Sequence, residues 1–185
     1  MSITAILLLA EGFEEIETAT TLDVLRRADI QIISASLSVD KLVVGSRNIT
    51  FQADKTLEES IETLFDLVIL PGGMPGAKNL RQDLRIPDFL EKHHRENRAL
   101  AAICAAPYVL GELGFLDGKK ATSYPTFQNR LGKSTVINEN VVVDGKIITS
   151  QGVGTALDFA LTLVSIFKGE KKSQELAEAM LVPIN

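Results

Sequence analysis

The chain has 185 residues, 45% of them hydrophobic, and a formal net charge of -5 at neutral pH. This length suits a single domain over residues 1–185, and the acidic balance gives no broad positive field for nucleic acid or an anionic membrane surface. One cysteine excludes an internal disulfide, and no cysteine or histidine cluster has zinc-site spacing, so we expect no metal and no cofactor. The opening residues lack a basic stretch and no apolar run reaches membrane-spanning length, which favours a cytoplasmic protein.

Strand-like and helix-like segments alternate along the chain. Ile3–Leu9 is a nearly continuous apolar run, and Glu14–Ala28 follows it with apolar residues at helical spacing. Further strands are predicted over Ile30–Ala35, Leu67–Leu70 and Leu100–Ile103, and further helices over Pro87–Asn97, from Ala156 to Lys168 and over Glu170–Leu181. This alternation indicates an α/β fold with a mostly parallel sheet covered by helices.

Two hairpins are predicted as small antiparallel additions at an edge of that sheet. Leu42–Val44 and Ile49–Phe51 flank a Gly45-Ser46 turn. Val141–Ile148 contains Asp-Gly, a pair that fits a tight hairpin turn.

The only cysteine, Cys104, lies where the strand Leu100–Ile103 ends and a helix is expected to begin near Pro107. A helix N-terminus lowers the pKa of a thiol, and the thiolate is the reactive species. Cys104 is therefore a candidate nucleophile. The structural alternative is an inert buried cysteine, the usual state of a free cysteine.

The segments that follow the parallel strands are expected to meet beyond the carboxyl ends of the sheet. Near Cys104 this places the turn at Gly72-Gly73, which lacks the spacing and the lysine of a P-loop. Its backbone N–H and that of Ala105 are suited to an oxyanion hole. The alternative is that Gly72-Gly73 forms a turn in which glycine is needed only for its positive φ, without a role in chemistry.

Glu17 shares a helical face with Phe13 and Val24, which favours its burial. A buried carboxyl near a thiolate tends to stay protonated and to donate a hydrogen bond to the sulfur. The alternative interpretation of Glu17 is a solvated charge on the helix surface. For Glu14 and Glu15, the favourable helix dipole and solvation are enough to account for acidic residues in the first helical turn.

His93 and His94 are the only histidines, and both lie in a polar stretch. We expect them on a solvated face, toward the end of the sheet opposite Cys104. A Cys-His dyad therefore has weak support.

Five motif segments occur in order across nearly the whole chain: Ala10–Thr18, Asp23–Arg27, Leu70–Gly73, Ala101–Pro107 and Thr149–Thr155. Together they resemble the ThiJ/PfpI superfamily, in its parkinsonism-associated protein deglycase branch, which includes bacterial YajL-type members. The resemblance implies a flavodoxin-like three-layer α/β/α sandwich of the class I glutamine amidotransferase-like type, forming a homodimer.

The resemblance also implies roles for particular residues. Cys104 matches the reactive, easily oxidised thiol at a nucleophile elbow, and Glu17 matches the protonated glutamate that hydrogen-bonds it. Gly73 and Ala105 match the backbone donors of the oxyanion site. Arg47 matches an arginine that reaches the site from the dimer partner.

The predicted pocket residues are Gly72, Met74, Tyr124 and Val153, and the chain departs from the family pattern at the last three and at Ala105. Tyr124 stands where many relatives carry a histidine, although YajL-type relatives also have an aromatic residue there, and tyrosine is a poor base near neutral pH. Ala105 replaces the histidine of protease-like members, which argues against peptidase activity. Met74 and Val153 replace common asparagine and proline residues, which changes the pocket and its substrate preference.

These features favour a cysteine-dependent glyoxalase or deglycase that acts on methylglyoxal or its adducts and protects against carbonyl and oxidative stress. The alternative is a redox-sensing or chaperone-like dimer in which Cys104 is oxidised to sulfinate, with little catalysis. The missing histidine favours this alternative. The third hypothesis is a vestigial, inactive site on a dimer with a structural role.

Overall fold

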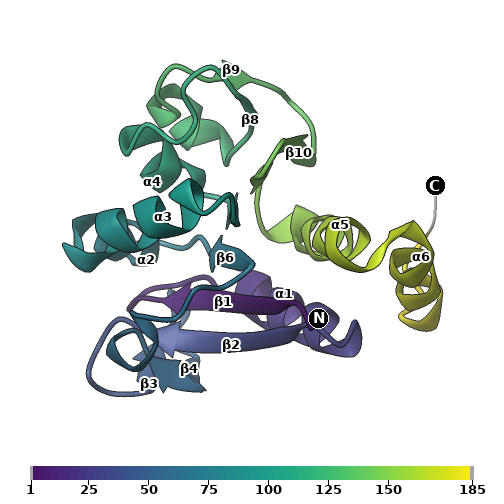
Figure 1. The fold of residues 1–185 in the computed structure, drawn as a ribbon, viewed down its shortest axis with the longest axis horizontal. Coiled ribbons are helices and arrows are strands. Elements are labelled where there is room, and N and C mark those ends of the chain that lie inside the picture. The colour runs from purple at the N-terminus through teal and green to yellow at the C-terminus, as the bar shows by residue number, and fades with distance from the viewer. Residues whose placement is uncertain (1, 184–185) are drawn as a thin grey trace.

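The computed structural model describes residues 2–183 as one central sheet with helices on both faces (Figure 1). The sheet has the strand order β10-β11-β7-β6-β1-β2-β5, and all neighbouring strands pair in parallel except β10 and β11. Its strands are β1 (Thr4–Leu9), β2 (Gln31–Ser36), β5 (Lys55–Thr56), β6 (Leu67–Leu70), β7 (Ala99–Ile103), β10 (Val141–Asp144) and β11 (Ile147–Ser150). Two small sheets pair β3 (Leu42–Val44) with β4 (Thr50–Gln52) and β8 (Lys120–Ala121) with β9 (Thr135–Val136).

The helices form two layers because successive strand residues point to opposite faces of the sheet. On β1, Ile6 and Leu8 join the core under α2, α3 and α4, whereas Ala5, Leu7 and Leu9 join the core under α1 and α5. The helices are α1 (Glu15–Arg27), α2 (Gly76–Gln82), α3 (Arg85–Arg95), α4 (Pro107–Glu112), α5 (Ala156–Lys168) and α6 (Glu170–Ala179), with short 3-10 turns η1 (Glu58–Ser60), η2 (Pro125–Arg130) and η3 (Val153–Thr155).

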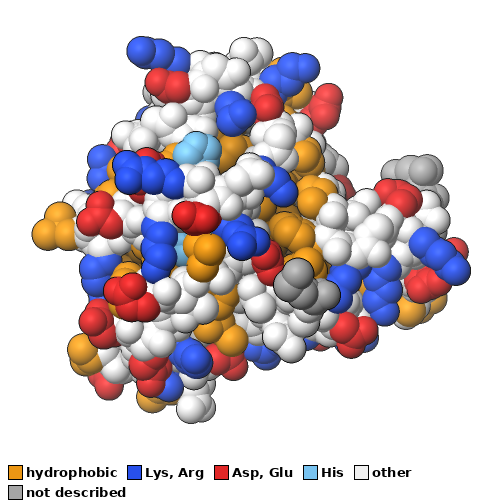
Figure 2. Space-filling model, viewed as in Figure 1, with side chains coloured by type: hydrophobic (Ala, Val, Ile, Leu, Met, Phe, Trp, Pro, Cys, Tyr) orange, Lys and Arg blue, Asp and Glu red, His pale blue; other side chains and the backbone are white. Residues whose placement is uncertain are grey.

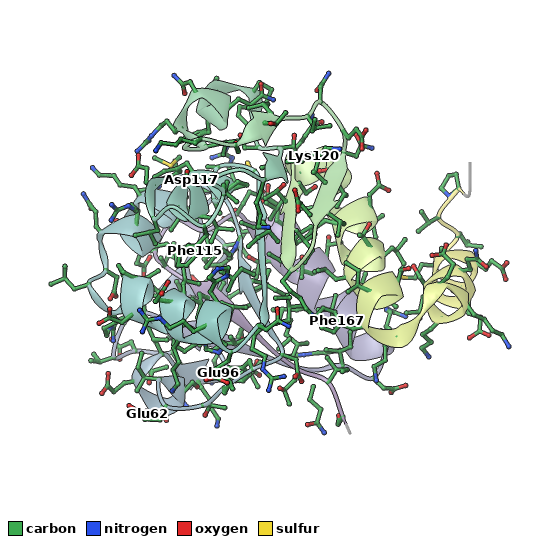
Figure 3. All side chains as sticks on the ribbon, turned by 45° about the horizontal axis from the view of Figure 1, so that its top comes forward. Glu62, Glu96, Phe115, Asp117, Lys120 and Phe167 are labelled. Carbon is green, nitrogen blue, oxygen red and sulfur yellow. The ribbon has the colours of Figure 1, made fainter. Side chains whose placement is uncertain are left out.

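The surface differs sharply from these two cores. In Figure 3, Phe115 lies within the α2–α4 side of the molecule, while Glu62 and Glu96 lie toward its edge. Basic and acidic side chains are interspersed over the face shown in Figure 2. Across residues 2–183, no helix combines the length and the apolar character that crossing a membrane requires.

Every strand and hairpin predicted from the sequence forms within two residues of its expected bounds, so the fold class is confirmed. The structure differs from the prediction in several details. β11 pairs in parallel with β7 in the main sheet, leaving β10 as the antiparallel edge strand, and β3–β4 forms a separate sheet. Helix α2 was not predicted, because its first turn contains Gly76 directly after Pro75, a pair typical of a loop. Helix α6 ends at Ala179.

The prediction that both histidines are solvated is wrong for His93, which is fully buried. Its Nε2 accepts the backbone N–H of Phe65 at 3.1 Å, and its Nδ1 lies 2.7 Å from the carbonyl oxygen of Phe89, to which it donates. Phe65 precedes β6, so His93 lies at the amino end of the sheet, away from Cys104, as expected. His94 is exposed.

Acid should destabilise the protein through His93, since burial lowers the pKa of its imidazole below the ordinary value of 6.5. The neutral ring stabilises the fold fully above pH 6.5, and this contribution is lost as the pH falls toward the lower folded-state pKa. The unfolding free energy of a His93→Gln variant should therefore fall less steeply with acidification, by up to about 1.4 kcal/mol per pH unit. Denaturant titrations across this range measure the slope. His94→Gln is the matched control, and an equal change in its slope would contradict the assignment.

Candidate active site

Three loops meet where the adjacent strands β1, β6 and β7 end, as the sequence predicts. The loop after β11 joins them because β11 lies next to β7. Together with the β3–β4 hairpin and η2, these loops enclose a pocket of about 360 Å³. Its lining residues are Glu14, Ser46, Arg47, Gly73, Met74, Cys104, Ala105, Tyr124, Phe127 and Val153.

Cys104 adopts the left-handed conformation, with φ 63°, which non-glycine residues seldom occupy. Its backbone is held on both sides: its N–H donates to the carbonyl of Ser150 at 3.0 Å, and its carbonyl accepts from the N–H of Tyr124 at 2.7 Å. Such contacts maintain a strained residue at a site. The thiol is half-buried and lines the pocket.

Glu17 is completely buried beside the cysteine, which confirms the interpretation of its helical face. One carboxyl oxygen, Oε2, accepts the N–H of Gly72 at 2.8 Å. The other, Oε1, is buried without a nitrogen or oxygen partner in the described chain. The Glu14 carboxylate caps helix α1 by accepting the Glu17 N–H at 2.7 Å, and this fixes the first turn that carries Glu17.

The thiol pKa is raised, so the prediction of a helix-lowered pKa is wrong. Burial is the main cause, the ionised Glu17 carboxylate adds to it, and together they raise the pKa of Cys104 to about 12. Helix α4 is short and starts only at Pro107, so its dipole does not compensate.

Burial also raises the pKa of Glu17, to about 7, while its bond from Gly72 opposes this shift. Each group is therefore hard to ionise while the other is charged, and between the two pKa values, about 7 and about 12, the pair holds one proton. When that proton lies on Glu17, the carboxyl no longer repels the thiolate and can donate to it.

Two backbone N–H groups interact with the Cys104 sulfur, those of Ala105 and Gly73, and both act to lower its pKa. They are the donors that the sequence analysis proposed. Gly73 has φ +89°, and a Cβ there would lie 2.5 Å from the backbone nitrogen of Glu14. Glycine therefore lets this turn approach the site closely.

Gly72 packs closely against both Cys104 and Glu17. A Cβ at this position would lie 2.5 Å from the Cβ of Cys104 and 2.8 Å from Oε2 of Glu17. Gly72→Ala should push the two side chains apart and destabilise the fold by about 1–3 kcal/mol. Thermal unfolding and the rate of Cys104 alkylation measure both effects. Gly154→Ala is the control because a Cβ there meets nothing within 4 Å, and equal behaviour of the two variants would refute this role.

Arg47 lines the pocket of its own chain, and its predicted delivery to the pocket of a dimer partner stays a prediction. Glu15 positions it: this carboxylate is only 4% exposed and accepts the Arg47 backbone N–H at 2.5 Å and the Ser46 hydroxyl at 3.2 Å. Burial opposes ionisation of Glu15, but these bonds lower its pKa below the ordinary value. The prediction that Glu15 is a solvated charge at the start of the helix is therefore wrong.

The remaining predicted pocket residues Met74, Tyr124 and Val153 all line the pocket, and each is at least 40% exposed. The sequence analysis missed Gly152, where a Cβ would lie 3.8 Å from the Cys104 sulfur, and Phe127 of η2. Gly152 lies within the motif Thr149–Thr155, so the sequence did indicate this segment as part of the site. In residues 2–183, no group of three or more metal-ligating side chains is assembled.

A strained cysteine after a parallel strand, a buried carboxyl beside it and two N–H groups at its sulfur define a nucleophile-elbow site on an α/β sandwich. The chain belongs to the DJ-1/PfpI family, whose model matches residues 3–166.

Curated relatives agree with this membership. Protein dj-1beta of Drosophila melanogaster is 40% identical over 187 residues and both chains are covered completely. The glutathione-independent glyoxalase DJR-1.2 of Caenorhabditis elegans is 34% identical over 179 residues, covering 95% of this chain and 94% of the relative. Protein DJ-1 homolog B of Arabidopsis thaliana is 39% identical over 175 residues, 94% of this chain, but the match spans only 40% of that longer protein.

Solved structures share the fold along the whole chain. The crystal structure of Drosophila melanogaster DJ-1beta has a TM-score of 0.96 and 38% identity, covering 100% of each chain. A DJ-1 superfamily protein from Salmonella typhimurium has a TM-score of 0.95 and 34% identity, covering 98% of this chain and 100% of that one.

Proposed function

We propose that the protein is a cofactor-independent glyoxalase or deglycase-type enzyme that uses Cys104 as nucleophile on methylglyoxal or its adducts. The observation that carries this proposal is the Cys104–Glu17 pair, one shared proton beside two backbone donors in an open pocket. The relative named as a glutathione-independent glyoxalase supports the same chemistry. Protection against carbonyl and oxidative stress follows from removal of such aldehydes.

In the proposed reaction, the thiol proton moves to Glu17 and the sulfur attacks the aldehyde carbon. A C–S bond forms, the C=O π electrons become an oxyanion, and the N–H groups of Gly73 and Ala105 stabilise it. Glu17 then protonates this oxygen to give a hemithioacetal.

Transfer of the C1 hydrogen to C2 as a proton, through an enediol, converts the hemithioacetal into a thioester. Glu17 is the group placed to carry that proton. Water then breaks the C–S bond, releasing lactate and the thiol. The net reaction adds one water to methylglyoxal and needs no external oxidant or reductant.

The redox-sensing alternative rests on the same pocket. The half-buried sulfur lines an open pocket and can be reached by a peroxide, the oxidant this alternative requires, and the resulting sulfinate would accept a hydrogen bond from protonated Glu17. Tyr124 supports this alternative because it supplies no imidazole for proton transfer.

We also propose that the protein works as a homodimer. The β3–β4 hairpin and helix α1 expose three apolar side chains: Ile16 is 56% exposed, Ile49 is 54% exposed and Val44 is 38% exposed. A second copy would bury them. Sedimentation of the wild type against an Ile16→Glu variant tests this, with a dimer expected only for the wild type.

The function is tested by supplying methylglyoxal without any added thiol and counting lactate molecules per subunit, with the buffer reaction subtracted. Many lactates per subunit are expected. Uptake of one aldehyde per subunit without lactate would refute the enzyme and favour a scavenging or redox-sensing thiol.

A further inference from the structure

Beside the reactive pocket lies a second, larger hollow of about 610 Å³, and we propose that it binds the carboxylate tail of an extended carbonyl substrate whose aldehyde reacts at Cys104. This inference rests on the proposed function, because it names the class of substrate that the same site would take. The hollow is built by α2, the start of α3, α4 and η2, and the Cys104 chemistry does not use it.

The two hollows share a wall. Met74 lines both of them, is 45% exposed and carries an unbranched, adaptable side chain. The segment η2 also lies between the two hollows. Its Phe127 lines the reactive pocket, and its Arg130 lines the second hollow. A substrate that passes over Met74 would therefore occupy both spaces.

Positive charge exceeds negative charge around the second hollow, although the whole chain carries -5. Lys78, Arg81 and Arg130 line it, and Lys78 has no ion-pair partner among the described residues. Of the two carboxylates in the lining, Asp83 is already held by Arg85, with contacts at 2.9 Å and 2.5 Å.

The other lining carboxylate, Glu112, is shared by two arginines. It contacts Arg81 Nε at 3.2 Å and Arg130 Nη2 at 2.5 Å. One carboxylate cannot neutralise two guanidinium groups, and each retains N–H donors. The Arg130 guanidinium also lies 4.0 Å from the ring centroid of the buried Tyr108, which fixes its plane.

This arrangement favours a carboxylate as the occupant. A planar, pre-oriented guanidinium matches the two oxygens of a carboxylate, and an unpaired lysine adds a point charge. Methylglyoxal is too small and uncharged to use these groups. The chemical class is therefore a 2-oxoaldehyde, or an adduct of one, whose carbon chain ends in a carboxylate.

The test measures alkylation of Cys104 by N-substituted iodoacetamides whose tails of increasing length end in a carboxylate, with the methyl ester of each as the neutral partner. Mass spectrometry gives the rates for the wild type and for the double variant Lys78→Gln with Arg81→Gln. The control double variant is Arg95→Gln with Lys171→Gln, which removes the same kinds of charge from the exposed surfaces of α3 and α6.

In the wild type and the control, the longer acids should alkylate Cys104 about threefold faster than their esters at low salt. In the Lys78 and Arg81 variant the acid-to-ester ratio should fall toward one, because the remaining Arg130 is neutralised by Glu112. At high salt the preference should disappear, while plain iodoacetamide reacts equally with all proteins. An acid-to-ester ratio that is the same in both double variants would overturn the subsite. Alkylation requires no turnover, so the lactate assay can fail while this assignment stands, and the reverse also holds.

Discussion

Replacing Cys104 with serine removes lactate formation from methylglyoxal, with an expected loss of at least about a thousandfold. A serine hydroxyl is a much weaker nucleophile than a thiolate, and the pocket offers no imidazole to activate it. Steady-state lactate assays without added thiol give the rate.

The fold should survive this substitution, since the two side chains have nearly the same shape and the backbone bonds of Cys104 to Ser150 and Tyr124 remain. An unchanged thermal midpoint shows that the loss is chemical. Wild-type lactate rates in a folded Cys104→Ser protein would remove the cysteine from the mechanism.

Glu17→Gln should lower turnover by about a hundredfold, because an amide cannot accept and return the thiol proton. Glutamine has nearly the same shape and can still accept the Gly72 N–H, so the variant tests proton transfer and not packing. Retained turnover would show that Glu17 only fills space.

The same substitution should raise stability at alkaline pH. The pKa of Glu17 is about 7 in the fold and 4.5 ordinarily, so its contribution to stability is complete below pH 4.5 and is lost as the pH rises through 7. Above that pH, Glu17→Gln should be more stable than the wild type by up to about 3 kcal/mol. Denaturant unfolding at both ends of this range measures the difference, and equal stability in alkali would contradict the buried charge.

Local patterns predicted the parts of the site that lie on regular elements. The apolar run before Cys104 located the strand, and the helical spacing from Phe13 through Glu17 located the buried carboxyl. Glycines at Gly72-Gly73 marked the close backbone approach that the structure confirms.

The parts that were missed depend on contacts between distant segments. Glu15 is buried by a hairpin more than thirty residues away in sequence, and His93 is buried by the segment before β6. The thiol pKa was predicted in the wrong direction because a helix start is visible in the sequence, whereas burial beside an ionised glutamate is not. Tertiary packing decided each of these cases.

The pairing of Cys104 with Glu17 is tested most directly by the pH dependence of Cys104 alkylation in the wild type and Glu17→Gln. A pair that shares one proton predicts two steps in the wild type: a rise to a plateau near the Glu17 pKa of about 7, and a second rise toward 12. Glu17→Gln should show a single step, without the rise near 7. Identical profiles in both proteins would contradict the pairing on which the proposed chemistry depends.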